Sequence, residues 1–110
     1  MDKQLFIWGR GVFGQFMTPH RVKAAANIDI MDFKISKGGT GVILTNRGDV
    51  YTWGENEYGQ LGHGDFNPRR APEKVESLGQ KKVTDVFLGY DYVLALGVNL
   101  PQSEYEQAAL

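Results

Sequence analysis

Three glycines near the N-terminus have the spacing of a dinucleotide-binding loop. Gly9, Gly11 and Gly14 form a G-x-G-x-x-G pattern directly after the apolar run LFIW. In a Rossmann fold these glycines precede a helix whose N-terminus faces the pyrophosphate of the cofactor. Pro19 follows soon after and would interrupt that helix in its first turns. We therefore expect the glycines to close turns between strands, and the sequence indicates no bound cofactor.

The remaining chemistry-bearing residues form no catalytic or metal-binding pattern. His20 and His63 lack the spacing of metal ligands, and no serine lies in a nucleophile-elbow context. Asp65 follows His63 by two residues, which predicts an Asx-type turn or a hydrogen bond that holds a long loop. We therefore expect no catalytic residue and no metal ligand, and we predict that the chain is not an enzyme.

The composition excludes several classes of protein. The chain has 110 residues, 42% of them hydrophobic, which allows one domain with a folded core. A net charge of -1 gives no global field toward nucleic acid or anionic lipid. Cysteine is absent, and no apolar run approaches the roughly 18 residues of a membrane-spanning helix. We therefore expect an intracellular protein, cytoplasmic or nuclear, without a membrane span and without a nucleic-acid partner.

The chain repeats itself at a distance of 45 residues. Trp8, Gly9, Gly14 and Gln15 reappear as Trp53, Gly54, Gly59 and Gln60. Later in the unit the distance grows, because Asp32 corresponds to Asp85, 53 residues further on. An eight-residue insertion near GHGDFNPR in the second unit accounts for this growth, and insertions between matching elements are loops.

Two positions of the repeat carry specific expectations. Gly11 of the first unit corresponds to Asn56 of the second. Glycine and asparagine both tolerate the left-handed backbone region, so we expect this position to require that backbone angle. Trp8 and Trp53 end apolar runs at equivalent places, which predicts a shared packing role against a neighbouring sheet.

The apolar residues occur in short runs that end at glycine, asparagine, aspartate or proline, which is typical of strands. The clearest hairpin joins VILT to VYTW through the turn at 46–48. Helical composition is confined to 20–27 and 103–110, which are short enough to be single turns. The class is therefore predicted to be all-β, and a repeat of this length with several strands indicates propeller blades.

These residues also carry a family resemblance. GDVYTWGENEYGQLGHGD and VTDVFLGYDYVLALG resemble a repeat of the regulator of chromosome condensation family, and the likeness extends over 5–97. The resemblance implies a β-propeller of about seven four-stranded blades. It divides the chain into a first, degenerate repeat at 1–48, a second, well-matched repeat at 49–97, and a tail at 98–110.

Two antiparallel blade-like repeats cannot close a propeller ring within this chain. We expect apolar residues on the open faces to be exposed, among them Val83, Val86, Leu94 and Leu96. The chain therefore needs a neighbour. Three arrangements fit: other subunits complete the faces, copies of the chain associate, or the chain is part of a longer propeller.

Four basic residues are candidates for contact with a partner: Arg69, Arg70, Lys81 and Lys82. They flank the segment APEKVES, whose glutamates partly neutralise them, and could face phosphate or an acidic partner if the insertion folds over one rim. The leading functional hypothesis is a non-catalytic protein-protein interaction module or accessory subunit. The alternative, which the resemblance implies, is a guanine-nucleotide exchange factor for a small GTPase, or a fragment of one.

Overall fold

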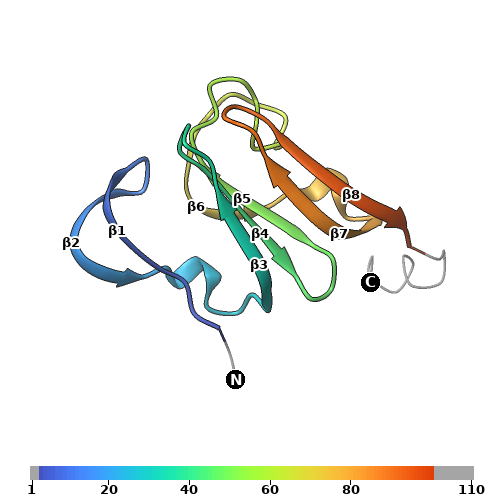
Figure 1. Ribbon diagram of the computed structural model, residues 1–110, viewed down its shortest axis with the longest axis horizontal. Coiled ribbons are helices and arrows are strands. Elements are labelled where there is room, and N and C mark those ends of the chain that lie inside the picture. Colours follow the sequence, from blue (N-terminus) through green and yellow to red (C-terminus); the bar gives the residue numbers. More distant parts are fainter. Residues whose placement is uncertain (1–2, 101–110) are drawn as a thin grey trace.

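The computed structural model of the protein describes residues 3–100, and these residues form an all-β structure (Figure 1). The strands are β1 (Phe6–Gly11), β2 (Gly14–Arg21), β3 (Ile30–Ile35), β4 (Thr40–Thr45), β5 (Val50–Gly54), β6 (Arg69–Lys74), β7 (Lys81–Leu88) and β8 (Val93–Asn99). Two 3-10 turns, η1 (Lys23–Ala25) and η2 (Glu76–Leu78), connect them. The helix-like segment 20–27 thus supplies one turn, while 103–110 lies outside the described residues.

The strands form three antiparallel sheets. β3-β4-β5-β6 is a four-stranded sheet in the centre, and β1-β2 and β7-β8 are two-stranded sheets at opposite ends of the molecule (Figure 1). The predicted fold class is confirmed, and the ring is not closed. β3 and β4 of the central sheet precede residue 48, and β5 and β6 follow it. Each sequence repeat therefore contributes two strands to this sheet, and the sheet does not coincide with one repeat. The boundaries of the repeats at 1–48, 49–97 and 98–110 stay a prediction.

The hairpin expected at 46–48 is present between β4 and β5. Gly48 N donates to Thr45 O at 3.0 Å, and Asp49 N donates to the Thr45 hydroxyl at 3.0 Å. Gly48 has a φ of +87°, which is why glycine ends this turn. The register then pairs Val42 with Thr52.

The internal repeat is visible in the backbone. Val22 N donates to Leu5 O at 2.8 Å, and 53 residues later Val75 N donates to Val50 O at the same distance. Each of these valines directly precedes a 3-10 turn, and the two valines have nearly the same φ and ψ angles. The register shift near residue 30 in β3 likewise recurs near residue 83 in β7. Equivalent sequence positions therefore hold equivalent structural positions.

Two apolar clusters join the sheets. One lies between the central sheet and β7-β8, and comprises Val42, Leu44, Val50, Val75, Val83 and Val86. The other lies between the central sheet and the β1-β2 side, and comprises Leu5, Ala25, Ile30, Ile43 and Trp53. Burying apolar side chains between sheets in this way is the main stabilising contribution in such a structure.

The prediction of exposed residues on the last hairpin was half right. Leu94 and Leu96 are 58% and 61% exposed, as expected. Val83 and Val86 are 3% and 1% exposed, so the prediction was wrong for them. The reason is that one face of β7-β8 already packs on the central sheet, and only its other face is open.

Candidate functional site

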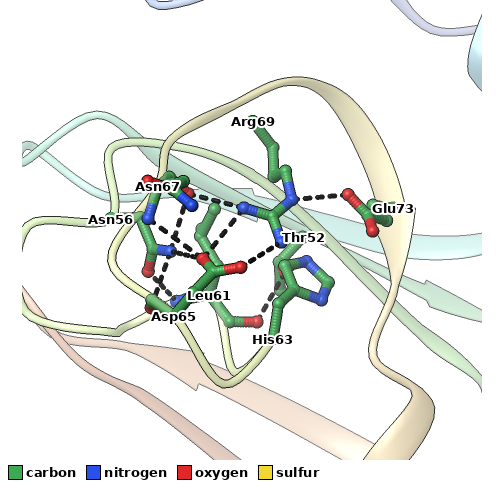
Figure 2. Close-up of polar contacts among 8 residues, drawn as sticks. All are labelled: Thr52, Asn56, Leu61, His63, Asp65, Asn67, Arg69 and Glu73. Atoms are coloured by element: carbon green, nitrogen blue, oxygen red, sulfur yellow. Dashed lines mark hydrogen bonds and ion pairs between the residues drawn. The ribbon is translucent and has the colours of Figure 1, made fainter.

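The segment between β5 and β6, residues 55–68, is folded into a loop held by side-chain hydrogen bonds (Figure 2). Gly59, Gly62 and Gly64 have φ values of +74°, +77° and +85°, which let the chain reverse direction repeatedly. This loop contains the eight-residue insertion that separates the second sequence unit from the first. Its interior is polar and is organised around one asparagine.

Asn56 is 1% exposed and bonds through both ends of its amide. Its Nδ2 lies 3.1 Å from Asp65 O, 3.1 Å from Asp65 Oδ1 and 2.8 Å from Asn67 O. Its Oδ1 accepts from Leu61 N at 3.1 Å. In the described residues no buried side-chain nitrogen or oxygen lacks a partner, so this network is complete.

The expectation of a left-handed backbone at Gly11 and Asn56 was wrong. In the described chain no residue other than glycine has a positive φ, and Gly11 is not among the glycines that do. Asn56 is needed for its side-chain hydrogen bonds. A Cβ at Gly11 would meet only the ring edge of Phe13, a side chain that can turn away. The two positions share a place in the repeat but not a physical requirement.

Asp65 holds the loop in the way expected from the sequence. Its Oδ1 accepts from Asn67 N at 3.0 Å, which is an Asx-type turn, and also from Arg69 Nη1 at 3.0 Å. Arg69 Nη2 donates to Asp65 Oδ2 at 2.9 Å. These hydrogen bonds from Arg69, followed by the one from Asn67, lower the pKa of Asp65 from its usual 3.8 to about 2.

Arg69 donates four hydrogen bonds to partners within the chain. Besides Asp65, it bonds Glu73 Oε2 through Nε at 2.5 Å and Asn67 O through Nη1 at 2.7 Å (Figure 2). These carboxylates raise the pKa of Arg69 further above its usual range. Its role in the structure is to fasten the loop to β6, and a partner contact through Arg69 stays a prediction.

The other three basic candidates lie on exposed surface. Arg70 borders a hollow beside Phe13 and Trp53. Lys81 donates to Asn99 Oδ1 of the neighbouring strand, and Lys82 is exposed on β7. Arg70 belongs to the central sheet, whereas the lysines belong to β7-β8. A partner contact through these residues stays a prediction.

His63 belongs to the same loop network. The Thr52 hydroxyl donates to Leu61 O at 2.7 Å and lies 2.9 Å from His63 Nε2. Across residues 3–100, histidine and acidic side chains nowhere gather in threes in a way that could hold a metal ion. The polar cluster therefore consists of hydrogen bonds that shape a loop.

The two tryptophans have different surroundings. Trp53 is 4% exposed and packs in the cluster on the β1-β2 side, close over Gly41. Trp8 is 61% exposed. The predicted packing role is thus found at Trp53, and was wrong for Trp8 within this chain, because no sheet of the described residues covers it.

Repeat glycines occupy equivalent backbone conformations. Gly9 and Gly54 have φ values of +93° and +103°, and Gly14 and Gly59 also lie in the positive region. β2 begins at Gly14, so the segment after the G-x-G-x-x-G pattern is a strand, which excludes the Rossmann arrangement. Of the two repeat glutamines, Gln60 accepts from Tyr58 N at 2.9 Å, and Gln15 is exposed.

Exposed apolar side chains lie on both end hairpins and on the edge strand β3 of the central sheet. They are Phe6, Trp8 and Met17 on β1-β2, Phe33 and Ile35 on β3, and Phe87, Leu94, Leu96 and Val98 on β7-β8, each at least 49% exposed. A groove of about 540 Å³, lined in part by Val50, Leu61 and Ala95, lies between the central sheet and the face of β8 that carries Ala95. Exposed apolar surface of this kind is typical of interaction sites.

A four-stranded antiparallel sheet with a further sheet packed on each side is the arrangement of neighbouring blades in a β-propeller. Residues 47–96 match the family model of the regulator of chromosome condensation (RCC1) repeat. This chain therefore carries an RCC1 repeat, and the resemblance seen in the sequence is confirmed.

Known proteins support this assignment. A Rattus norvegicus protein named probable E3 ubiquitin-protein ligase HERC4 is 31% identical in an alignment 103 residues long that covers 84% of this chain and 10% of that protein. Human WBSCR16 has a TM-score of 0.76 at 21% identity, over 89% of this chain and 27% of that one. Prp20p from Saccharomyces cerevisiae, described with its binding to Gsp1p and histones, has a TM-score of 0.74 at 19% identity, over 91% and 24%.

The extent of these matches limits what they show. The structural matches, at these identities, show the fold alone. The chain spans about a tenth of the length of HERC4 and about a quarter of each solved structure. No helix in the described part of the chain has the length and hydrophobicity needed to cross a membrane.

Proposed function

We propose that this chain is a non-catalytic protein-protein interaction module built from propeller repeats. The observation that carries the proposal is the apolar surface on the sheets at both ends, where Trp8 and Leu96 are each 61% exposed. Side chains of this size gain about 1.5–3 kcal/mol each on full burial, so contact with another protein surface is favourable. An intracellular location, cytoplasmic or nuclear, belongs to the same proposal.

The polar loop supports the proposal because its chemistry is structural. Asn56, Asp65 and Arg69 bond one another and the backbone, which leaves no activated nucleophile or free acid-base pair in this cluster. The loop is a rigid connection between β5 and β6. The loop joins two strands of the central sheet, and the two end hairpins pack on either side of that sheet.

Native mass spectrometry of the protein isolated from its source tests the proposal. We expect species heavier than the 12.3 kDa monomer. The identity and stoichiometry of the added mass would name the partner. A folded protein recovered solely as the monomer, with Leu94 and Leu96 accessible to a surface label, would contradict the proposal.

Guanine-nucleotide exchange is the second candidate function. It is favoured by the fold shared with Prp20p, whose structure is described with its binding to Gsp1p. A nucleotide-release assay with small GTPases separates the two functions. Accelerated release by the chain supports exchange activity, and unchanged release together with a stable partner complex supports the interaction module.

A further inference from the structure

The two end hairpins have complementary free edges. Among residues 3–100, β8 pairs with β7 alone and β1 pairs with β2 alone, whereas β4 and β5 join two equivalent hairpins into one sheet. We infer that β8 of one copy of this chain pairs with β1 of a second copy, completing a four-stranded sheet β7-β8-β1-β2. The inference rests on the proposed interaction function and names its partner as a second copy.

The internal repeat fixes the register of this pairing. Ile43 of β4 pairs with Tyr51 of β5. The equivalent of Ile43 in β8 is Ala95, because Phe33 pairs with Ile43 and its equivalent Val86, 53 residues later, pairs with Ala95. The equivalent of Tyr51, 45 residues earlier, is Phe6. Ala95 of one copy therefore lies opposite Phe6 of the second.

Exposed apolar residues on β3 of the central sheet also indicate a second copy of the chain as the partner. Val86 is 1% exposed, because it packs in the cluster that contains Val42 and Leu44 of β4. Its equivalent in β3, Phe33, is 49% exposed, and the nearby Ile35 is 60% exposed. The hairpin β1-β2 covers part of this side through Leu5, but the residues that would correspond to those of β4 are absent from it.

Leu94 and Leu96 of β8 are the equivalents of Val42 and Leu44. Both are exposed in the single chain. Pairing of β8 with β1 of the second copy carries them over Phe33 and Ile35 of that copy. One association thus covers exposed apolar residues from both partners, which is the main source of affinity in a protein interface.

The proposed register brings residues of opposite charge together. Residues 3–28 contain four lysines or arginines and no acidic residue, and the β7-β8 hairpin carries Asp85 and Asp91 as well as Lys81 and Lys82. Glu55 N donates to Gly39 O at 3.0 Å where β5 leaves β4. The equivalents of these two residues are Arg10 and Asp91. The same register therefore places Arg10 of one copy beside Asp91 of the other, which favours the pairing electrostatically.

The association is head-to-tail, because the two hairpins lie at opposite ends of the chain (Figure 1). Such an interface uses different surfaces on the two partners, so copies add in sequence until a ring closes. Two variants, each with a substitution in a different one of the two interface surfaces, can then bind each other through their unchanged surfaces. Leu94→Asp damages one end of the chain and Phe33→Asp damages the other, and both residues are exposed, so neither change disturbs the core.

Size-exclusion chromatography with light scattering on the purified full chain provides the test. We expect the unmodified chain to exceed 12.3 kDa, each variant alone to be a monomer, and an equimolar mixture of the two to form a dimer and nothing larger. An unmodified chain that stays monomeric, or two monomeric variants that do not combine, would overturn the inference. Far-UV circular dichroism confirms that both variants are folded.

Cysteine pairs test the register independently, since the chain has no cysteine of its own. Ala95→Cys with Phe6→Cys should give disulfide-linked multimers on mild oxidation. Ala95→Cys with Ile7→Cys is the matched control, because neighbouring strand residues point to opposite faces. Linkage in the control alone would contradict the register. If the purified chain is monomeric while native complexes contain another protein, this inference fails and the proposed function stands.

Discussion

Asn56 and Asp65 are joined by a hydrogen bond from Nδ2 to Oδ1, 3.1 Å long, that closes the loop between β5 and β6. The same carboxylate oxygen also accepts from Asn67 N and Arg69 Nη1. One buried amide and one carboxylate thus hold both ends of a segment that has no regular secondary structure. The stability of this loop depends on these two side chains, which lie nine residues apart in the sequence.

Replacing Asn56 with alanine should destabilise the protein by about 1–3 kcal/mol, because the buried Leu61 N–H is left unpaired, whereas Asn67 O keeps its hydrogen bond from Arg69. Urea unfolding of the purified chain measures the change. The control is Asn46→Ala in the exposed β4–β5 turn, for which we expect little change. Equal effects at the two positions would show that the network contributes nothing.

Acid should weaken the loop through Asp65. The pKa of Asp65 in the folded protein is lowered to about 2 from its usual 3.8, so its contribution is present above pH 4 and is lost as the pH falls toward 2. Urea midpoints between pH 2 and 7 should therefore fall more steeply for the unmodified chain than for Asp65→Asn. Glu57→Gln, on the exposed part of the same loop, should follow the unmodified chain.

The equivalent glycines Gly9 and Gly54 should respond differently to alanine. Both have positive φ values, and holding an alanine there costs about 1–2 kcal/mol. At Gly54 a Cβ would also collide with the carbonyl oxygen of Gly39, whereas at Gly9 nothing lies within 4 Å. Thermal unfolding should show a clearly larger loss for Gly54→Ala. A similar loss at both sites would mean that backbone angle alone decides.

Val86 and Val98 lie on the same hairpin and provide a matched test of the core. Val86 is 1% exposed, and Val86→Ala should cost about 2 kcal/mol from lost burial and the cavity left behind. Val98 is 58% exposed, and Val98→Ala should change stability by no more than about 0.5 kcal/mol. Urea unfolding at low protein concentration measures both. Equal losses would contradict the packing of β7 on the central sheet.

Much of the fold follows from local sequence patterns. Six of the eight strands, the hairpin at 46–48 and the loop character of the insertion were expected, because each depends on neighbouring residues alone, whereas β2 and β6, which contain Pro19 and Pro72, were not. The role of Asp65 was also predictable, since an Asx turn spans two residues. The role of Asn56 was not, because its partners become its neighbours only after the loop has folded.

Burial was the property that local patterns could not supply. Val86 and Leu94 belong to similar apolar runs, yet one is buried and the other is exposed. The repeat in the sequence also gave no sign that a sheet takes two strands from each unit. The sequence by itself determined the repeating unit, most of the strands and the clearest turn, since these arise from backbone preferences and short-range spacing. The tertiary structure decided which faces are covered, because burial depends on surfaces that distant parts of the chain bring together.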